Sequence, residues 1–208
     1  MRKTILPLVV AVLAASGVGC ASLTTNTKAP SFEKKYSRFQ YCAIEVTRQG
    51  RPWTCGAACL VSVMKYWGQI VSEDALIQEH PRTKKNGYGV LDLKAMAIEY
   101  GLQAYAICMA PDGKSKLKEQ VSKGRPVICA VKFPRFWYCI RFIPLSRGPY
   151  WRLTSLFHTG KDHFVVVFGF DDKNVLLMDP AHGFAVLSWA RFEDSWHKME
   201  HAALISSS

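Results

Sequence analysis

Cys55 combines a reactive side chain with a position that would activate it. It stands at the start of residues 54–68, an almost uncharged stretch in which Leu60, Val63 and Met64 recur at helical spacing. The first turn of a helix has unpaired backbone N–H groups and a partial positive charge, which favour an anion. A thiol placed there should have a lowered pKa and act as a nucleophile. Cys59, one turn later, should be packed in the core.

A nucleophilic thiolate needs a base that can later protonate a leaving amine. Among the six histidines, His163 is best placed because it begins a predicted strand. Asp179 ends the returning strand of the same predicted hairpin and could orient the imidazole. Asp162 is the alternative, although adjacent strand residues point to opposite faces. Gln49 precedes Cys55 by six residues and could donate its side-chain amide beside the Cys55 N–H, as an oxyanion hole requires.

The elements that must position these residues change type along the chain. Helices are predicted over residues 54–68, 72–79, 90–100 and 114–123. Short β-branched and aromatic runs predict strands at 126–131, 163–170, 175–178 and 184–187, with a turn at 171–174. The result is an α+β domain with a helical N-terminal half and an antiparallel β-sheet in the C-terminal half. The nucleophile would lie at the N-terminus of the buried first helix.

The composition indicates one globular domain. A chain of 208 residues with 49% apolar side chains can bury one core, and two domains would each be small. Its seven cysteines are too few for a disulfide scaffold. The net charge of +11 would attract anionic head groups or acidic substrates, or it reflects a solvated basic face. No nucleic-acid recognition motif accompanies the charge, so nucleic acid is not expected as a partner.

The first 35 residues have the pattern of an export signal and a tether. A basic start, an apolar run and small residues lead to Cys20, which predicts a signal peptide over residues 1–19. The string SGVGC resembles the lipobox of bacterial lipoproteins and implies that Cys20 is lipidated, with plain cleavage near Gly17 or Ala21 as the alternative. Residues 20–35 are polar and would tether the domain, residues 36–208, to a membrane. We therefore expect a protein of the bacterial cell envelope, outside the cytoplasm.

Residues 132–161 form a basic aromatic insertion in this domain. They hold eight aromatic residues, six Lys or Arg and no acid. This is long for a loop in a compact domain, so it is predicted to contain extra secondary structure or to act as a flap. A locally packed insertion with a basic rim is the alternative.

Several of these residues together carry a family resemblance. Gln49, then RPWTCGAACL, then DHFVVVFGFDDKNVLLMDPAHG are similar to the papain-like bacteriocin-processing peptidases, which cut leader peptides after a double glycine. The resemblance covers about residues 45–198. It implies a papain-like fold with Cys55 as nucleophile, His163 as base and acid, Asp179 as orienter and Gln49 as oxyanion donor.

The expected activity is that of a thiol-dependent peptidase acting on an envelope or exported peptide or protein. The best-known members of the family are fused to an export transporter, whereas this chain has a secretory signal, so the resemblance leaves the substrate open. An acyl transferase with the same triad is one alternative. A non-catalytic peptide-binding lipoprotein is another.

A second motif suggests different chemistry. Residues 197–201, HKMEH, match the H-x-x-E-H pattern in which two histidines on one helical face bind zinc. Such enzymes need a further carboxylate downstream, and no acid follows His201. A solvated terminal segment is the other interpretation of these residues. Neither a metal nor another cofactor is expected.

We therefore predict that activity is independent of metal. Peptide turnover should be unchanged by EDTA and abolished by thiol alkylation, as measured on the purified protein before and after each treatment. Loss of turnover in EDTA with recovery on adding Zn²⁺ would instead support the zinc motif.

Overall fold

The structure of the chain is a computed structural model that describes residues 36–82, 87–134 and 160–208. Within it, Ser37–Ser208 form one compact unit. The predicted signal peptide (1–19), the tether (20–35) and Cys20 lie outside the described residues. So does most of the insertion 132–161, whose first three residues end one strand and whose last two begin the next.

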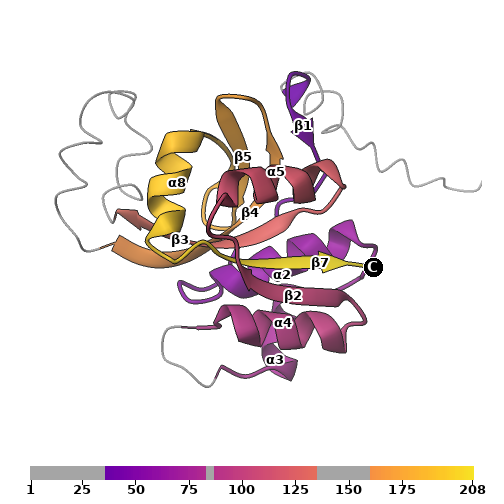
Figure 1. The fold of residues 1–208 in the computed structure, drawn as a ribbon. Helices are drawn as coiled ribbons and strands as arrows, with labels where there is room; N and C mark the ends of the chain where they lie inside the picture. Colours follow the sequence, from indigo (N-terminus) through magenta and orange to yellow (C-terminus); the bar gives the residue numbers. More distant parts are fainter. Residues whose placement is uncertain (1–35, 83–86, 135–159) are drawn as a thin grey trace, which may run out of the picture. The chain divides into compact units, whose positions relative to one another are not determined.

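The described residues form a mixed α/β fold around an antiparallel sheet (Figure 1). The strands are β1 (Gln40–Tyr41), β2 (Gln103–Cys108), β3 (Val127–Pro134), β4 (Gly160–Phe170), β5 (Asn174–Asp179), β6 (Gly183–Ser188) and β7 (Ala202–Ser207). The helices are α2 (Cys55–Tyr66), α3 (Glu73–Glu79), α4 (Val90–Glu99), α5 (Gly113–Ser122) and α8 (Trp189–His197). The order in the sheet is β2-β7-β3-β4-β5-β6, and β1 pairs with β4.

Helix α2 is the central helix of the fold. Every residue from Cys55 to Met64 is buried, because α2 packs against β4 of the sheet and against α3 and α4. In Figure 1, α2, α3 and α4 are grouped in the lower part of the view, and α5 and α8 in the upper part, with strands between them. No helix of the described ranges is long and apolar enough to cross a bilayer.

The local signals for helix ends are confirmed. The Ser72 hydroxyl accepts a hydrogen bond from the Ala75 N–H at 3.1 Å and so caps α3. Helices α4 and α5 are followed by Gly101 and Gly124, whose φ angles of 81° and 75° lie in the left-handed region that glycine adopts without strain. All four predicted helices begin and end within three residues of their expected bounds.

The division into a helical half and a strand half is only partly correct. Strand β2 lies between α4 and α5 and pairs with β7 near the chain's end, and β7 also pairs with β3. Both strands were missed, as was α8. Ala203 and Leu204 on β7 are almost fully buried because this short strand has neighbours on both edges. Such long-range pairing leaves little local signal in a six-residue segment.

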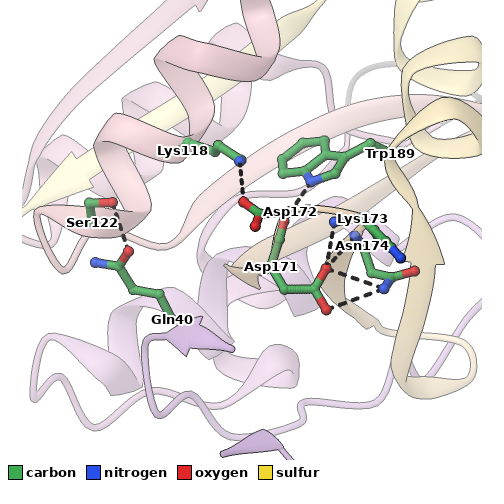
Figure 2. A network of polar contacts seen from close by, with 8 residues as sticks. All are labelled: Gln40, Lys118, Ser122, Asp171, Asp172, Lys173, Asn174 and Trp189. Carbon is green, nitrogen blue, oxygen red and sulfur yellow. Dashed lines mark hydrogen bonds and ion pairs between the residues drawn. The ribbon is translucent and has the colours of Figure 1, made fainter. Parts of the chain in front are cut away.

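The predicted turn at 171–174 joins β4 to β5 and is held from several sides (Figure 2). Asp171 Oδ1 accepts from the backbone N–H of Lys173 at 2.8 Å and also from that of Asn174. The Trp189 indole N–H donates to the Asp171 carbonyl at 2.9 Å. Lys118 Nζ lies 3.8 Å from an Asp172 carboxylate oxygen. This turn therefore fixes the β4–β5 hairpin, which carries two of the predicted site residues.

Gly169 allows β1 and β5 to approach β4 from both sides, at a point where the β4–β5 register shifts. A Cβ at this position would lie 2.6 Å from Tyr41 Cβ and 2.8 Å from Leu176 Cδ1. We predict that Gly169→Ala lowers the free energy of unfolding by about 1–3 kcal/mol, the usual cost of overpacking. Thermal unfolding followed by circular dichroism would measure the effect.

Gly101→Asn is a suitable control, because a side chain there meets nothing within 4 Å and Asn tolerates the left-handed conformation. The control should melt near the wild-type temperature. Equal melting of Gly169→Ala and wild type would show that β1 is not held closely on β4.

Candidate active site

Cys55 is the first residue of α2, and its surroundings favour a thiolate. The preceding residue, Thr54, does not cap the helix, because its hydroxyl donates to the Arg51 carbonyl at 3.0 Å and accepts from the Arg51 N–H at 3.2 Å. No acidic residue lies in the first turn of α2. The backbone N–H groups of Gly56 and Phe164 hydrogen-bond the Cys55 sulfur. The partial positive charge at the N-terminus of α2 therefore acts on the Cys55 thiol and stabilises its thiolate form.

His163 lies between the thiol and a carboxylate. It occupies β4, three residues after the strand begins at Gly160, and is 3% exposed. Its Nε2 is 3.0 Å from Asp179 Oδ1. Its side chain also hydrogen-bonds the Cys55 thiol. Cys55, His163 and Asp179 therefore form a continuous chain of hydrogen bonds.

Asp179 ends β5 and uses both of its carboxylate oxygens. Oδ1 also accepts from the Ala181 N–H at 2.8 Å, and Oδ2 lies 3.0 Å from His182 Nδ1. The alternative carboxylate, Asp162, instead pairs with Lys132 at 3.5 Å, and its side chain is 66% exposed. Of the two acidic residues considered, only Asp179 is therefore brought to the imidazole.

The pKa shifts follow from this geometry. Burial raises the pKa of the Cys55 thiol, but the hydrogen bond and positive charge of His163 outweigh it, so the pKa lies below its ordinary value. Burial lowers the pKa of His163, but its hydrogen bonds to Asp179 and Cys55 raise it to about 9. Burial raises the pKa of Asp179, but His163 and then His182 lower it to about 2. The three shifts together favour the charged forms, a thiolate and a carboxylate on either side of an imidazolium.

Gln49 is held on the loop before α2. Its backbone N–H donates to the Pro180 carbonyl at 3.1 Å, which ties this loop to the turn after Asp179. Its side-chain Nε2 donates to the Arg51 carbonyl at 3.0 Å, while its Oε1 is buried without a hydrogen-bond partner. One N–H of the Gln49 side-chain amide thus donates to the Arg51 carbonyl. The second N–H is the one that could donate to a substrate.

The site has one member that the sequence analysis missed. The sequence analysis did not single out His182, yet its ring hydrogen-bonds Asp179 and its side chain is only 13% exposed. Its place three residues after Asp179 was a visible signal. That signal could be interpreted only with the conformation of the turn between β5 and β6.

The zinc motif is not supported. Helix α8 ends at His197, and Glu200 and His201 both have a φ of 54°, so the two histidines do not share a helical face. His201 is not solvated, as it is 8% exposed and hydrogen-bonds Glu193. Among the described residues, no group of three or more His, Cys, Asp or Glu could hold a metal ion.

The cysteines differ in exposure. Cys42, Cys59 and Cys129 are buried, and Cys59 is fully enclosed in the core as predicted. Cys55 is only 9% exposed, whereas Cys108 on β2 is exposed. Selective reaction of Cys55 must therefore come from its thiolate character and not from greater exposure.

We predict that iodoacetamide at pH 6 alkylates Cys55 faster than any other cysteine. An ordinary thiol with a pKa of about 8.5 is under about 1% thiolate at that pH, and among the cysteines that the structure describes only Cys55 hydrogen-bonds a histidine. His163→Gln should slow this reaction by about tenfold or more, since each pKa unit changes the thiolate fraction tenfold. Peptide mapping by mass spectrometry would give both rates, with Cys108→Ser as the background. Faster labelling of Cys42 or Cys139 would contradict the assignment.

Three solved structures of similar fold are named as a protease, a peptidase domain and a C39-like peptidase. A double glycine motif protease from an AMS/PCAT transporter, solved with the leader peptide, is 22% identical with a TM-score of 0.58, covering 81% of this chain and 94% of its own. The peptidase domain of Streptococcus ComA, a bi-functional ABC transporter, is 21% identical with a TM-score of 0.56. The match covers 77% of this chain and 96% of that domain. A C39-like peptidase from Bacillus anthracis is 16% identical with a TM-score of 0.59. The match covers 80% of this chain and 95% of that chain. At these identities the similarity establishes the shared fold.

The sequence itself identifies the family. No curated protein matches the chain significantly. The sequence profile of the Peptidase C39 like family, however, matches residues 36–204, most of the chain and all of the site described above. The resemblance to bacteriocin-processing peptidases is thereby confirmed, together with the papain-like α+β fold. The chain belongs to the Peptidase C39 like family and is a cysteine peptidase.

Proposed function

We propose that this cysteine peptidase cleaves peptide bonds through a Cys55–His163–Asp179 triad, assisted by Gln49. The observation that carries the proposal is the position of His163, whose imidazole hydrogen-bonds both the Cys55 thiol and the Asp179 carboxylate. A base with a pKa of about 9 is protonated at neutral pH, so it can deliver a proton to a leaving amine.

In the acylation step, the Cys55 thiolate attacks the carbonyl carbon of the scissile bond and forms a carbon–sulfur bond. The carbonyl oxygen becomes an oxyanion, for which the Cys55 backbone N–H and the second N–H of the Gln49 amide are the candidate donors. The tetrahedral species then collapses, the carbon–nitrogen bond breaks, and the imidazolium of His163 gives its proton to the departing amine. A thioester on Cys55 and a neutral His163 remain.

In the deacylation step, neutral His163 takes a proton from water, and the oxygen of that water attacks the thioester carbon. Collapse breaks the carbon–sulfur bond and releases a carboxylic acid, with the proton retained by the imidazolium beside the thiolate. An amine in place of water would give a new amide, which is the acyl transferase alternative.

We propose that this reaction takes place in the bacterial cell envelope, because the first 35 residues have the pattern of an export signal followed by a tether. Export by the signal over 1–19, lipidation at Cys20 and a tether over 20–35 would hold the domain at a membrane surface. The substrate would be a peptide or protein segment that is itself exported. A structural neighbour solved with a leader peptide supports binding of a peptide chain by this fold.

A mixed peptide library incubated with the purified protein in ¹⁸O-labelled water tests the reaction. Mass spectrometry should detect cleaved peptides whose new carboxyl groups carry one ¹⁸O, and Cys55→Ala should give none. Products that gain an amine without ¹⁸O would indicate acyl transfer. Rapid alkylation of Cys55 without any cleavage would count against a peptidase acting on free peptides.

Gln49→Ala tests the oxyanion assignment. We predict that kcat falls by about 10²–10³ with little change in KM, the usual effect of losing one such donor. Alkylation of Cys55 builds no tetrahedral oxyanion, so its rate should change far less. Gln49→Glu is the matched variant, because it keeps the shape and removes the donor. Turnover within about threefold of wild type in both variants would make Gln49 a structural loop residue.

A further inference from the structure

His182 folds back from the turn between β5 and β6 onto the carboxylate of Asp179. Its backbone N–H donates to the Asp179 carbonyl at 3.1 Å, which closes the turn. Its ring Nδ1 lies 3.0 Å from Asp179 Oδ2, and its side chain is 13% exposed. The backbone and the side chain of one residue thus both hold the end of β5.

The Asp179 carboxylate is shared between two imidazoles. Oδ1 faces His163, and Oδ2 faces His182. The Ala181 N–H adds a third contact, also to Oδ1, at 2.8 Å. With partners on both oxygens, the carboxylate cannot rotate without breaking a hydrogen bond to one of the rings. The bond to His182 therefore restricts how Oδ1 is presented to His163.

The part that the His182 ring plays in its hydrogen bond follows from the charge of its partner. Asp179 is ionised at neutral pH because its pKa is lowered to about 2, so both of its oxygens are acceptors. His182 must then carry a proton on Nδ1 and donate it to Oδ2. An asparagine can present a side-chain N–H near this position, whereas a phenylalanine keeps the ring and loses the donor.

We propose that His182 is a positioning residue for the triad: its Nδ1–H holds Asp179 in the orientation that keeps the His163 imidazolium beside the Cys55 thiolate. This inference rests on the proposed function and adds a fifth side chain to the four assigned there. Other ionisable groups near the carboxylate and its turn are Cys59 on α2 and Arg48, whose Nη2 lies 2.9 Å from the Cβ position at Gly183. They are unchanged in the variants below.

The test is the pH dependence of Cys55 alkylation by iodoacetamide, which needs no knowledge of the substrate. In His182→Phe, Asp179 loses the donor on Oδ2, His163 is less well held as a cation, and the Cys55 thiolate fraction falls. We expect the alkylation rate at pH 6 to drop by about tenfold or more, the usual scale for a hydrogen bond to a charged group. His182→Asn should stay within about threefold of wild type.

Two controls separate positioning from folding. Melting temperatures of both variants show whether the fold is retained, and His197→Asn at the end of α8 repeats the substitution away from the site. A wild-type pH profile in His182→Phe would overturn the proposal, as would equal losses in His182→Phe and His182→Asn. Slow alkylation of Cys55 in the wild-type protein would instead count against the triad itself.

Discussion

The Asp179 carboxylate joins parts of the site that are distant in the sequence. It receives His163 from β4 and His182 from the following turn, and the next residue, Pro180, accepts the backbone N–H of Gln49 from the loop before α2. The β4–β5 hairpin and the start of α2 are therefore mutually fixed. A change that moved this carboxylate would disturb His163, the loop before α2 and the turn after β5 together.

The burial of this network explains its electrostatics. His163 and Asp179 are 3% and 2% exposed, so each charged form depends on its partner for compensation. Burial alone would favour a neutral thiol, a neutral imidazole and a protonated carboxyl group. The hydrogen bonds reverse all three tendencies, and the uncapped first turn of α2 acts in the same direction at Cys55. The same interactions that hold the fold at this point thus prepare the nucleophile.

The positive charge of the chain is not spread evenly. Residues 1–35, 83–86 and 135–159 together hold 11 of the 27 Lys and Arg but only one of the 16 acids. The sheet and its helices are consequently close to neutral. Any attraction to anionic head groups or acidic substrates must therefore come mainly from the basic residues of these three segments.

The amino-acid sequence by itself determined the four helices, the β4–β5 hairpin and the choice of Cys55, His163 and Asp179 as residues that lie together. These depend on local periodicity, capping residues and motif spacing, all of which are readable along the chain. Tertiary structure alone decided the pairing of β2 with β7, the backbone conformation at Glu200 and His201 and the contact of His182 with Asp179. Strands β2 and β7 pair across about 100 residues, the backbone at Glu200 and His201 has a positive φ, and the His182 ring contacts the Asp179 carboxylate. These features arise only when distant segments pack.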